Sequence, residues 1–302
     1  MPETMPNGIF KQAVEARLKT LLTEPAGASE TDGSLYKAMS YSALDGGKRI
    51  RAFLVFGFYL ACKADGDLSV AADYAAAIEM MHAASLIHDD LPSMDNDDYR
   101  RGKLSNHKVF GEAGAILAGD GLIIKAFETA ASCSHCSPEQ NLKAVRVLAS
   151  KSGPDGMTGG QMLDIAGDTG KINGEMLEKL HTLKTSCLIS SACMLGCIAA
   201  DAAEKKIKAA EEYGRCVGLA FQIRDDILDI NGDPEKMGKT LGKDKKESKA
   251  TYPALFGMES SYKICKALTE RAAETLGVIG DNAAEPIAAL KRLALYLSER
   301  NS

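Results

Sequence analysis

The sequence predicts an all-α protein. Helical periodicity runs through most of the 302 residues, and alternating strand patterns bounded by turns are almost absent. Helix-start signals agree with this fold class, since Ser137-Pro138-Glu139 and Asn173-Gly174-Glu175 each open a periodic segment. The predicted helices share an apolar repeat of three to four residues and cover about residues 7–23, 49–63, 69–91, 111–132, 138–150, 174–200, 204–230, 258–277 and 282–299.

Breaks in the apolar pattern separate these helices. In chain order they fall at Gly46-Gly47, Pro92, Gly153-Pro154, Gly167 to Gly170 and Gly232 to Gly242. None is long and polar enough to be an interdomain linker, and no short repeat appears. We therefore expect residues 1–302 to form a single domain.

Composition excludes several classes of protein. A net charge of −5 gives no basic excess for binding nucleic acid. The first residues lack a basic start followed by an apolar core, and the most apolar stretch, Cys187 to Ala200, is too short to span a bilayer. We expect a cytoplasmic protein without stable membrane insertion, whose eight cysteines are reduced. Cys133 and Cys136 form a C-x-x-C pair, but no second pair stands at zinc spacing, so no metal role is predicted for them.

Two acidic clusters dominate the functional interpretation. They read Asp89-Asp90-Leu-Pro-Ser-Met-Asp95 and Asp225-Asp226-Ile-Leu-Asp229. On a helix, Asp225 and Asp229 are one turn apart on the same face. Carboxylate oxygens suit Mg²⁺, which keeps several waters and usually completes its shell with substrate phosphates. The predicted metal ligands are Asp89, Asp90, Asp95, Asp225, Asp226 and Asp229.

Both clusters lie near the C-terminal ends of predicted long helices. A helix C-terminus carries partial negative charge and favours cations, so carboxylates placed there indicate metal binding. Two such helices facing each other would form a pocket with carboxylates at its mouth and apolar walls below. That pocket suits a molecule with a charged head and an apolar tail.

Two basic segments are candidate anion sites. Gly46-Gly47-Lys48-Arg49-Ile50-Arg51 opens a predicted helix, where backbone amides and cations can bind phosphate. Arg100 and Arg101 follow the first acidic cluster and can grip diphosphate oxygens with paired hydrogen bonds. The alternative for the second segment is a solvated charged loop.

Other candidates have equally ordinary alternatives. His82 lies two helical turns before Asp89, yet a lone helical histidine is usually structural. Lys184-Thr185 and Gln222 could place a cation and polar oxygens near a reacting carbon, or serve only as surface and core residues. Lys239 belongs to a glycine-rich segment that is either a charged lid or an exposed loop.

With these residues assembled, the chain resembles the trans-type short-chain isoprenyl diphosphate synthases, the family of farnesyl and geranylgeranyl diphosphate synthases. The resemblance covers nearly the whole length. The blocks occur in the order of that family: GGKRIR, HAASLIHDDLPSMDNDDYRRGK, GGQMLDIAG, Lys184-Thr185, FQIRDDILD and the lysine-rich segment around Lys239. The first motif has two extra residues, as in the bacterial and plant subtypes.

The resemblance implies an isoprenoid synthase fold, usually a homodimer, with a cavity between the two aspartate-bearing helices. It implies three Mg²⁺ held by Asp89, Asp95 and Asp225, with Asp90 and Asp229 assisting. Arg100, Lys184 and Lys239 would bind an allylic diphosphate, namely dimethylallyl, geranyl or farnesyl diphosphate. Isopentenyl diphosphate would be bound by Gly47, Lys48, Arg51, His82 and Arg101. Thr185 and Gln222 would face the allylic cation.

The resemblance also bears on product length. The fifth residue before the first motif, often aromatic in farnesyl synthases, is Ala84 here, followed by Ser85. Two small side chains imply a deeper cavity, which favours the geranylgeranyl over the farnesyl product, and Ala84→Tyr is expected to shorten it. Residues on a facing helix, such as Ile124, Lys125 or Glu128, could close the floor instead.

Three other functions remain open from the sequence. A terpene cyclase would use the same fold, but it needs no second diphosphate site. A metal phosphohydrolase built around His88 and Asp89 would need more histidine ligands than five scattered residues readily give. A non-catalytic regulatory subunit would be expected to lack one of the two aspartate motifs.

Overall fold

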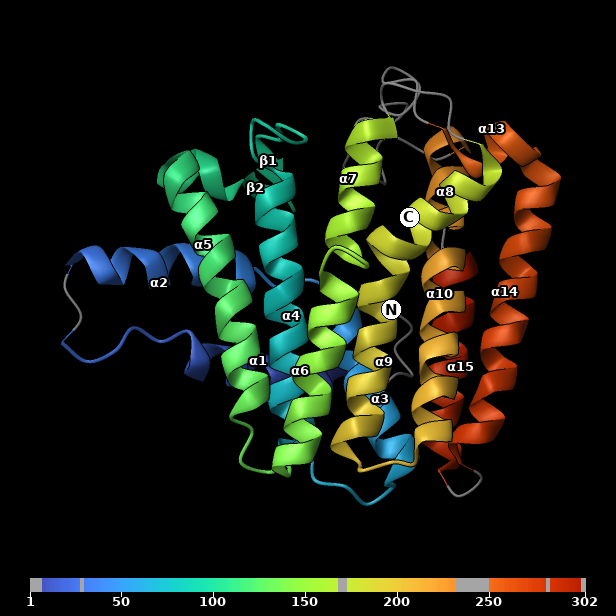
Figure 1. Cartoon of the computed structure of the whole chain (residues 1–302), viewed down its shortest axis with the longest axis horizontal. Helices are drawn as coiled ribbons and strands as arrows, with labels where there is room; N and C mark the ends of the chain where they lie inside the picture. Colours follow the sequence, from blue (N-terminus) through green and yellow to red (C-terminus); the bar gives the residue numbers. More distant parts are fainter. Residues whose placement is uncertain (1–6, 28–29, 168–172, 232–249, 281–282, 300–302) are drawn as a thin grey trace.

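The computed structural model describes residues 7–27, 30–167, 173–231, 250–280 and 283–299, and this part of the chain is almost entirely helical (Figure 1). The all-α prediction is confirmed. The helices are α1 (Asn7–Leu21), α2 (Glu30–Ala43), α3 (Ile50–Cys62), α4 (Ser69–Asp89), α5 (Asn106–Ala131), α6 (Pro138–Ser152), α7 (Met157–Gly167), α8 (Gly174–His181), α9 (Cys187–Ala199), α10 (Glu204–Asn231), α13 (Tyr252–Phe256), α14 (Met258–Ile279) and α15 (Ala284–Glu299). A π-helix, η1 (Thr182–Ser186), joins α8 to α9, and a two-residue hairpin pairs β1 (Tyr99–Arg100) with β2 (Lys103–Leu104).

Several predicted boundaries were wrong. Helices α2, α7 and α13 were not predicted; α7 contains Gly159 and Gly160, which weaken its helical pattern. Helix α5 begins before its predicted start and bends at Gly111, where φ is 77°. The long helix predicted over residues 174–200 is interrupted by η1.

Helix α9 packs against both α4 and α10 and so joins the two helices that carry the acidic clusters. Glycines on α10 allow a close approach. A Cβ built on Gly214 would lie 2.4 Å from the Cα of Ser190, and one on Gly218 would lie 2.5 Å from the Cα of Ser186. The contact therefore fixes η1 and α10 relative to each other.

Helices α4 and α10 end at the same end of the molecule, the upper end in Figure 1, as the acidic clusters required. The β1–β2 hairpin lies at that end too. Its turn places Arg101 and Gly102 at positive φ, 53° and 80°, the backbone form of tight two-residue hairpins. The hairpin thereby directs two adjacent arginines toward the end of α4.

One helical stretch, Gly174–Ala199, has the length and apolar composition of a membrane span, and 72% of its apolar window is buried inside the protein. Such burial is what a core helix requires. All eight cysteines are free thiols, as the sequence predicted. Cys133 and Cys136 both direct their sulfur atoms at the carbonyl oxygen of Val70, at 3.9 and 3.8 Å.

Candidate active site

The first acidic cluster folds back on the end of α4. The amide of Asp95 donates to the carbonyl of Asp89 at 2.9 Å, which closes the loop that carries the cluster. The pKa of Asp89 is raised to about 6, mainly by burial and in part by the neighbouring carboxylates of Asp95 and Asp90, against the opposing charges of Lys184 and Arg100. Like charges held together at a half-buried position favour a bound cation.

The donor chemistry of this cluster fits Mg²⁺. Among the described residues, no three His, Cys, Asp or Glu side chains converge closely enough to hold an ion without other ligands. Mg²⁺ does not need an all-protein cage, because waters and substrate phosphate oxygens fill much of its shell. Asp89 and Asp95 are therefore suited to a metal that arrives with a phosphorylated substrate.

In each aspartate pair, the second carboxylate is the more buried of the two. Asp90 is buried, and both its oxygens accept from Nε of Arg100, at 3.0 and 3.2 Å. Asp226 is buried too and accepts from the backbone N–H of Tyr252 at 2.9 Å. Asp89 and Asp225 are only half-buried. The two members of each aspartate pair therefore differ in burial.

A histidine stands beside the second cluster. Nε2 of His181 lies 4.0 Å from Asp226, and its ring stacks on Tyr252 with centroids 5.6 Å apart. Burial lowers the pKa of His181 to about 4, so the ring is neutral near pH 7. The contact of His181 with Asp226 is therefore packing and not an ion pair.

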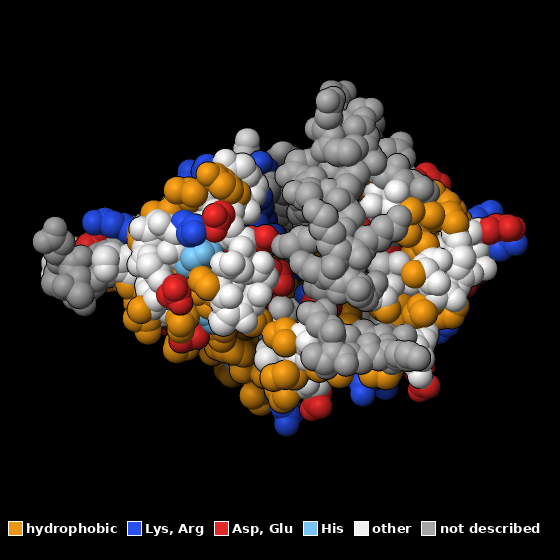
Figure 2. Space-filling view, turned by 90° about the horizontal axis from the view of Figure 1, so that it is seen from above, with side chains coloured by type: hydrophobic (Ala, Val, Ile, Leu, Met, Phe, Trp, Pro, Cys, Tyr) orange, Lys and Arg blue, Asp and Glu red, His pale blue; other side chains and the backbone are white. Residues whose placement is uncertain are grey.

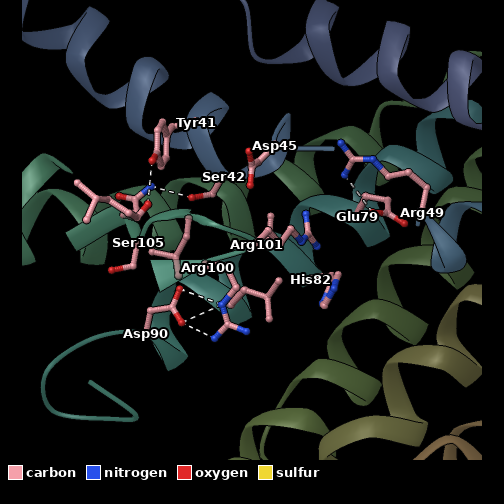
Figure 3. Close-up of a pocket in the computed structure, with 15 residues that line it drawn as sticks. Tyr41, Ser42, Asp45, Arg49, Glu79, His82, Asp90, Arg100, Arg101 and Ser105 are labelled. Atoms are coloured by element: carbon pink, nitrogen blue, oxygen red, sulfur yellow. Dashed lines mark hydrogen bonds and ion pairs between the residues drawn. The ribbon is translucent and has the colours of Figure 1, made fainter. Parts of the chain in front are cut away.

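A cationic pocket lies between the hairpin, α2 and α4, and Figure 3 shows the side chains that line it. Arg101 donates from Nη1 to the carbonyl of Gly46 at 3.1 Å. Gly47 has φ 101°, and a Cβ there would lie 3.0 Å from the guanidinium carbon of Arg101. The predicted Gly47 segment and Arg101 are thus brought together, and glycine is required for their approach.

Three acids line this pocket, and each is paired with a cation: Asp45 with Lys103, Glu79 with Arg49 and Asp90 with Arg100. Burial lowers the pKa of Arg51 to about 10, with Glu79 opposing the shift and Arg101 adding to it. Burial, together with Arg51 and Arg101, lowers the pKa of His82 well below its usual value, so this imidazole is neutral. Arg51 and Arg101 therefore lie close together beside a neutral imidazole, an arrangement that suits the binding of an anion.

A buried ion pair forms part of the pocket lining. Arg49 donates from Nη1 to Glu79 at 3.2 Å, and the other Glu79 oxygen accepts from the N–H of Ala52 at 3.0 Å. Arg49 itself has φ 48°, a conformation uncommon for residues other than glycine. We did not predict these roles, although a lone glutamate in the apolar run of α4 was a visible signal.

Lys48 lies outside the cationic pocket. Its exposed ammonium group is 3.5 Å from the hydroxyl of Tyr296 on α15 and 5.8 Å from the centre of that ring. The predicted anion ligand therefore rests against the C-terminal helix in this structure.

The predicted polar groups of the middle segment meet at η1. Lys184 Nζ lies 2.5 Å from Oδ2 of Asp164 on α7, and Thr185 donates to the amide oxygen of Gln222 at 3.0 Å. Single π-turns of this kind often mark functional sites. Lys184 also influences Asp89, which places η1 beside the first acidic cluster. Asp164 was missed as a partner, and Lys239 lies outside the described residues.

The two residues expected at the cavity floor differ in exposure. Ala84 has no exposed surface, whereas Ser85 is half-buried and donates to the carbonyl of His82 at 2.9 Å. On the facing helix, Ile124 is 69% exposed, and Lys125 pairs with Glu128 at 2.9 Å. Ser85 is therefore the member of the pair with surface left to contact a ligand.

Seen from the end that carries the site, acidic, basic and histidine side chains are visible among apolar ones over the half of the molecule formed by α4, α5 and the hairpin (Figure 2). Carboxylates at the ends of two facing helices, a lysine at η1 and a separate arginine pocket together define a class of enzyme. It is a metal-dependent enzyme that handles diphosphate esters.

Comparison with known proteins identifies the family within that class. The polyprenyl synthetase family matches residues 32–284. Geranylgeranyl pyrophosphate synthase 9 of Arabidopsis thaliana, a chloroplastic protein, is 43% identical over 275 residues, covering 89% of this chain and 75% of that protein. Farnesyl diphosphate synthase of Geobacillus stearothermophilus is 45% identical over 250 residues, 82% of each protein.

A solved structure agrees with these relatives. The geranyltransferase of Helicobacter pylori, crystallised with magnesium and isoprenyl diphosphate, aligns with a TM-score of 0.83 at 29% identity, covering 99% of this chain and all of that one. The chain belongs to the polyprenyl synthetase family and has the isoprenoid synthase fold. It is a prenyltransferase that makes short-chain prenyl diphosphates, and its family supports the use of Mg²⁺. The cyclase, phosphohydrolase and regulatory hypotheses are set aside.

Proposed function

We propose that the chain joins isopentenyl diphosphate head-to-tail to an allylic diphosphate and that geranylgeranyl diphosphate is its product. Two separate groups of charged side chains support this proposal. One brings Lys184 beside Asp89, and the other is the pocket lined by Arg101, next to which Arg51 lies. Two sites accommodate two diphosphates, which a condensation requires.

The allylic diphosphate, whether dimethylallyl, geranyl or farnesyl, is assigned to the acidic clusters and Lys184. Three Mg²⁺ are assigned to Asp89, Asp95 and Asp225, with Asp229 assisting; when bound, they stabilise the charge on the departing diphosphate. Asp90 accepts a hydrogen bond from Arg100, and Asp226 accepts one from the backbone of Tyr252. Arg100 thus approaches the allylic diphosphate from the Asp90 side.

Isopentenyl diphosphate is assigned to the arginine pocket. Arg101 and Arg51 supply charge, and the neutral His82 can offer a hydrogen bond without adding repulsion among the cations. Thr185 and Gln222 place their paired oxygens at η1, where they can face a carbon cation. The apolar faces of α4 and α9 would exclude water, which would otherwise capture that cation.

The test is a product assay. The protein is incubated with Mg²⁺, isopentenyl diphosphate and each of the three allylic primers, and the products are resolved by chain length. A twenty-carbon product supports the proposal. A fifteen-carbon product alone would replace it with farnesyl diphosphate synthesis, the second candidate, which the Geobacillus relative favours.

The cavity floor gives a second test. Ser85→Phe places an aromatic ring at a half-buried position, so we expect the main product to become shorter by one isoprene unit while thermal stability changes little. Ala84→Tyr should shorten the product as well, but with a loss of about 1–3 kcal/mol of stability, because Ala84 is fully buried. Product length and melting temperature are measured for both. Unchanged products in both variants would place the floor elsewhere.

We also propose a homodimer formed through α5. Leu117 and Ile124 are two turns apart on that helix and are 58% and 69% exposed, so they form an apolar strip suited to a second copy of the chain. A molar mass of one chain by light scattering would contradict this arrangement.

A cytoplasmic location without membrane insertion is a further proposal. The eight free thiols suit a reducing compartment. Within the described residues, the apolar helical stretch long enough to span a bilayer, Gly174–Ala199, is mostly buried inside the protein. Recovery of the native protein in a membrane fraction would contradict it.

A further inference from the structure

His88 links the end of α4 to α5. Its Nε2–H donates to the carbonyl of Ile116 at 3.2 Å, and the same nitrogen lies 3.8 Å from the carboxylate of Asp120. The ring occupies space that exists only because residue 119 is glycine. A Cβ on Gly119 would lie 2.1 Å from Nε2 of His88.

The turn anchored by His88 is the one that carries the first acidic cluster. A helix end lacks the hydrogen bonds that hold its interior, and it frays unless other groups restrain it. Here the carbonyl of His88 accepts from Leu91 at 3.2 Å, and the carbonyl of Asp89 accepts from Asp95 at 2.9 Å. The hydrogen bond between His88 and α5 therefore restrains the turn that carries Asp89 and Asp95.

We propose that His88 is a positioning residue, which sets the direction in which Asp89 and Asp95 meet Mg²⁺ by locking the last turn of α4 to α5. This inference rests on the metal assignment in the proposed function. His88 is assigned no direct role in the chemistry, since its ring is directed at α5. Gly119 is the complementary residue, because it leaves the space for the ring.

Size complementarity gives the test. In Gly119→Ala the new methyl group collides with the tip of a side chain and not with backbone, so the ring is displaced while α5 stays helical. His88→Ala removes the ring itself. We expect each variant to raise the Mg²⁺ concentration needed for half-maximal binding of inorganic diphosphate by about tenfold, the effect typical of losing a residue that orients a metal ligand.

The double variant separates positioning from general damage. With the ring gone, the three nearest contacts of the extra methyl group are gone too, so His88→Ala/Gly119→Ala should match His88→Ala within about twofold. His88→Gln, which keeps an N–H donor of similar reach, should recover most of the binding. Gly277→Ala on α14 is the matched control, since a Cβ there meets no atom within 4 Å.

Calorimetry with Mg²⁺ and inorganic diphosphate measures the binding, and hydrogen exchange of the amides in residues 89–96 reports the turn directly. Faster exchange there, together with weaker Mg²⁺-dependent binding, is expected in both single variants. Additive losses in the double variant, or lower melting temperatures with unchanged Mg²⁺ dependence, would overturn the positioning role. A wild-type protein that binds Mg²⁺ and diphosphate but does not condense the substrates would instead refute the proposed function alone.

Discussion

Asp225→Asn should reduce the condensation rate by at least about 10²-fold while leaving the melting temperature nearly unchanged. Asparagine has the same shape but no charge, so it weakens the grip on Mg²⁺ without leaving a gap in the helix. Asp225 is half-buried on α10, one turn from Asp229, and it is the member of its pair with surface left to meet a cation. Steady-state rates at several Mg²⁺ concentrations measure the effect.

The matched control is the same substitution at the neighbouring residue. Asp226 accepts from the backbone N–H of Tyr252, and the amide oxygen of asparagine can still accept that bond. Asp226→Asn should therefore keep its rate within about tenfold of wild type and lose about 1 kcal/mol of stability, as a charged hydrogen bond becomes a neutral one. Equal rate losses at the two positions would show that Asp226 leaves Tyr252 to bind the metal.

The hydrogen bonds that Asp90 and Asp226 accept could not be predicted from the sequence. Two adjacent aspartates in a sequence predict carboxylates at that place, but they do not predict which of the two faces the metal. That choice depends on Arg100, which the hairpin brings to Asp90, and on Tyr252, which returns to α10 from a distant part of the chain. Both are contacts between residues that helical periodicity does not relate.

The helices carrying the clusters were predicted well because their apolar patterns are long. Helices α4 and α10 have 21 and 28 residues, so the sequence predicts both helices and their C-terminal ends. It therefore also predicts that the two acidic clusters lie at helix ends. Helix α7 was not visible, since Gly159 and Gly160 look like a break in any local pattern. Its helical form follows from packing against η1, which only the folded chain supplies.

That packing leads to the second large effect, at Gly160. A Cβ on Gly160 would lie 2.2 Å from the backbone nitrogen of Lys184 and 2.6 Å from its Cα. Backbone at a helix contact cannot move aside cheaply, so Gly160→Ala should push α7 away from η1 at a cost of about 1–3 kcal/mol. The 2.5 Å contact of Lys184 with Asp164 would break as well.

The consequence for catalysis should exceed the consequence for stability. A shift of about 1 Å at η1 moves Lys184 and Thr185 together, and misplacement of that size can reduce a rate by about 10²-fold. We expect Gly160→Ala to lower kcat and to raise KM for the allylic substrate. The KM for isopentenyl diphosphate should stay within about twofold of wild type, because the arginine pocket is built by the hairpin, α2 and α4. Asp164→Asn removes the ion pair without any clash, so it should reproduce only the part of the defect that comes through Lys184. If Gly160→Ala instead raised both KM values equally, α7 would be supporting the whole bundle, and the close contact with η1 would have no special bearing on the allylic site.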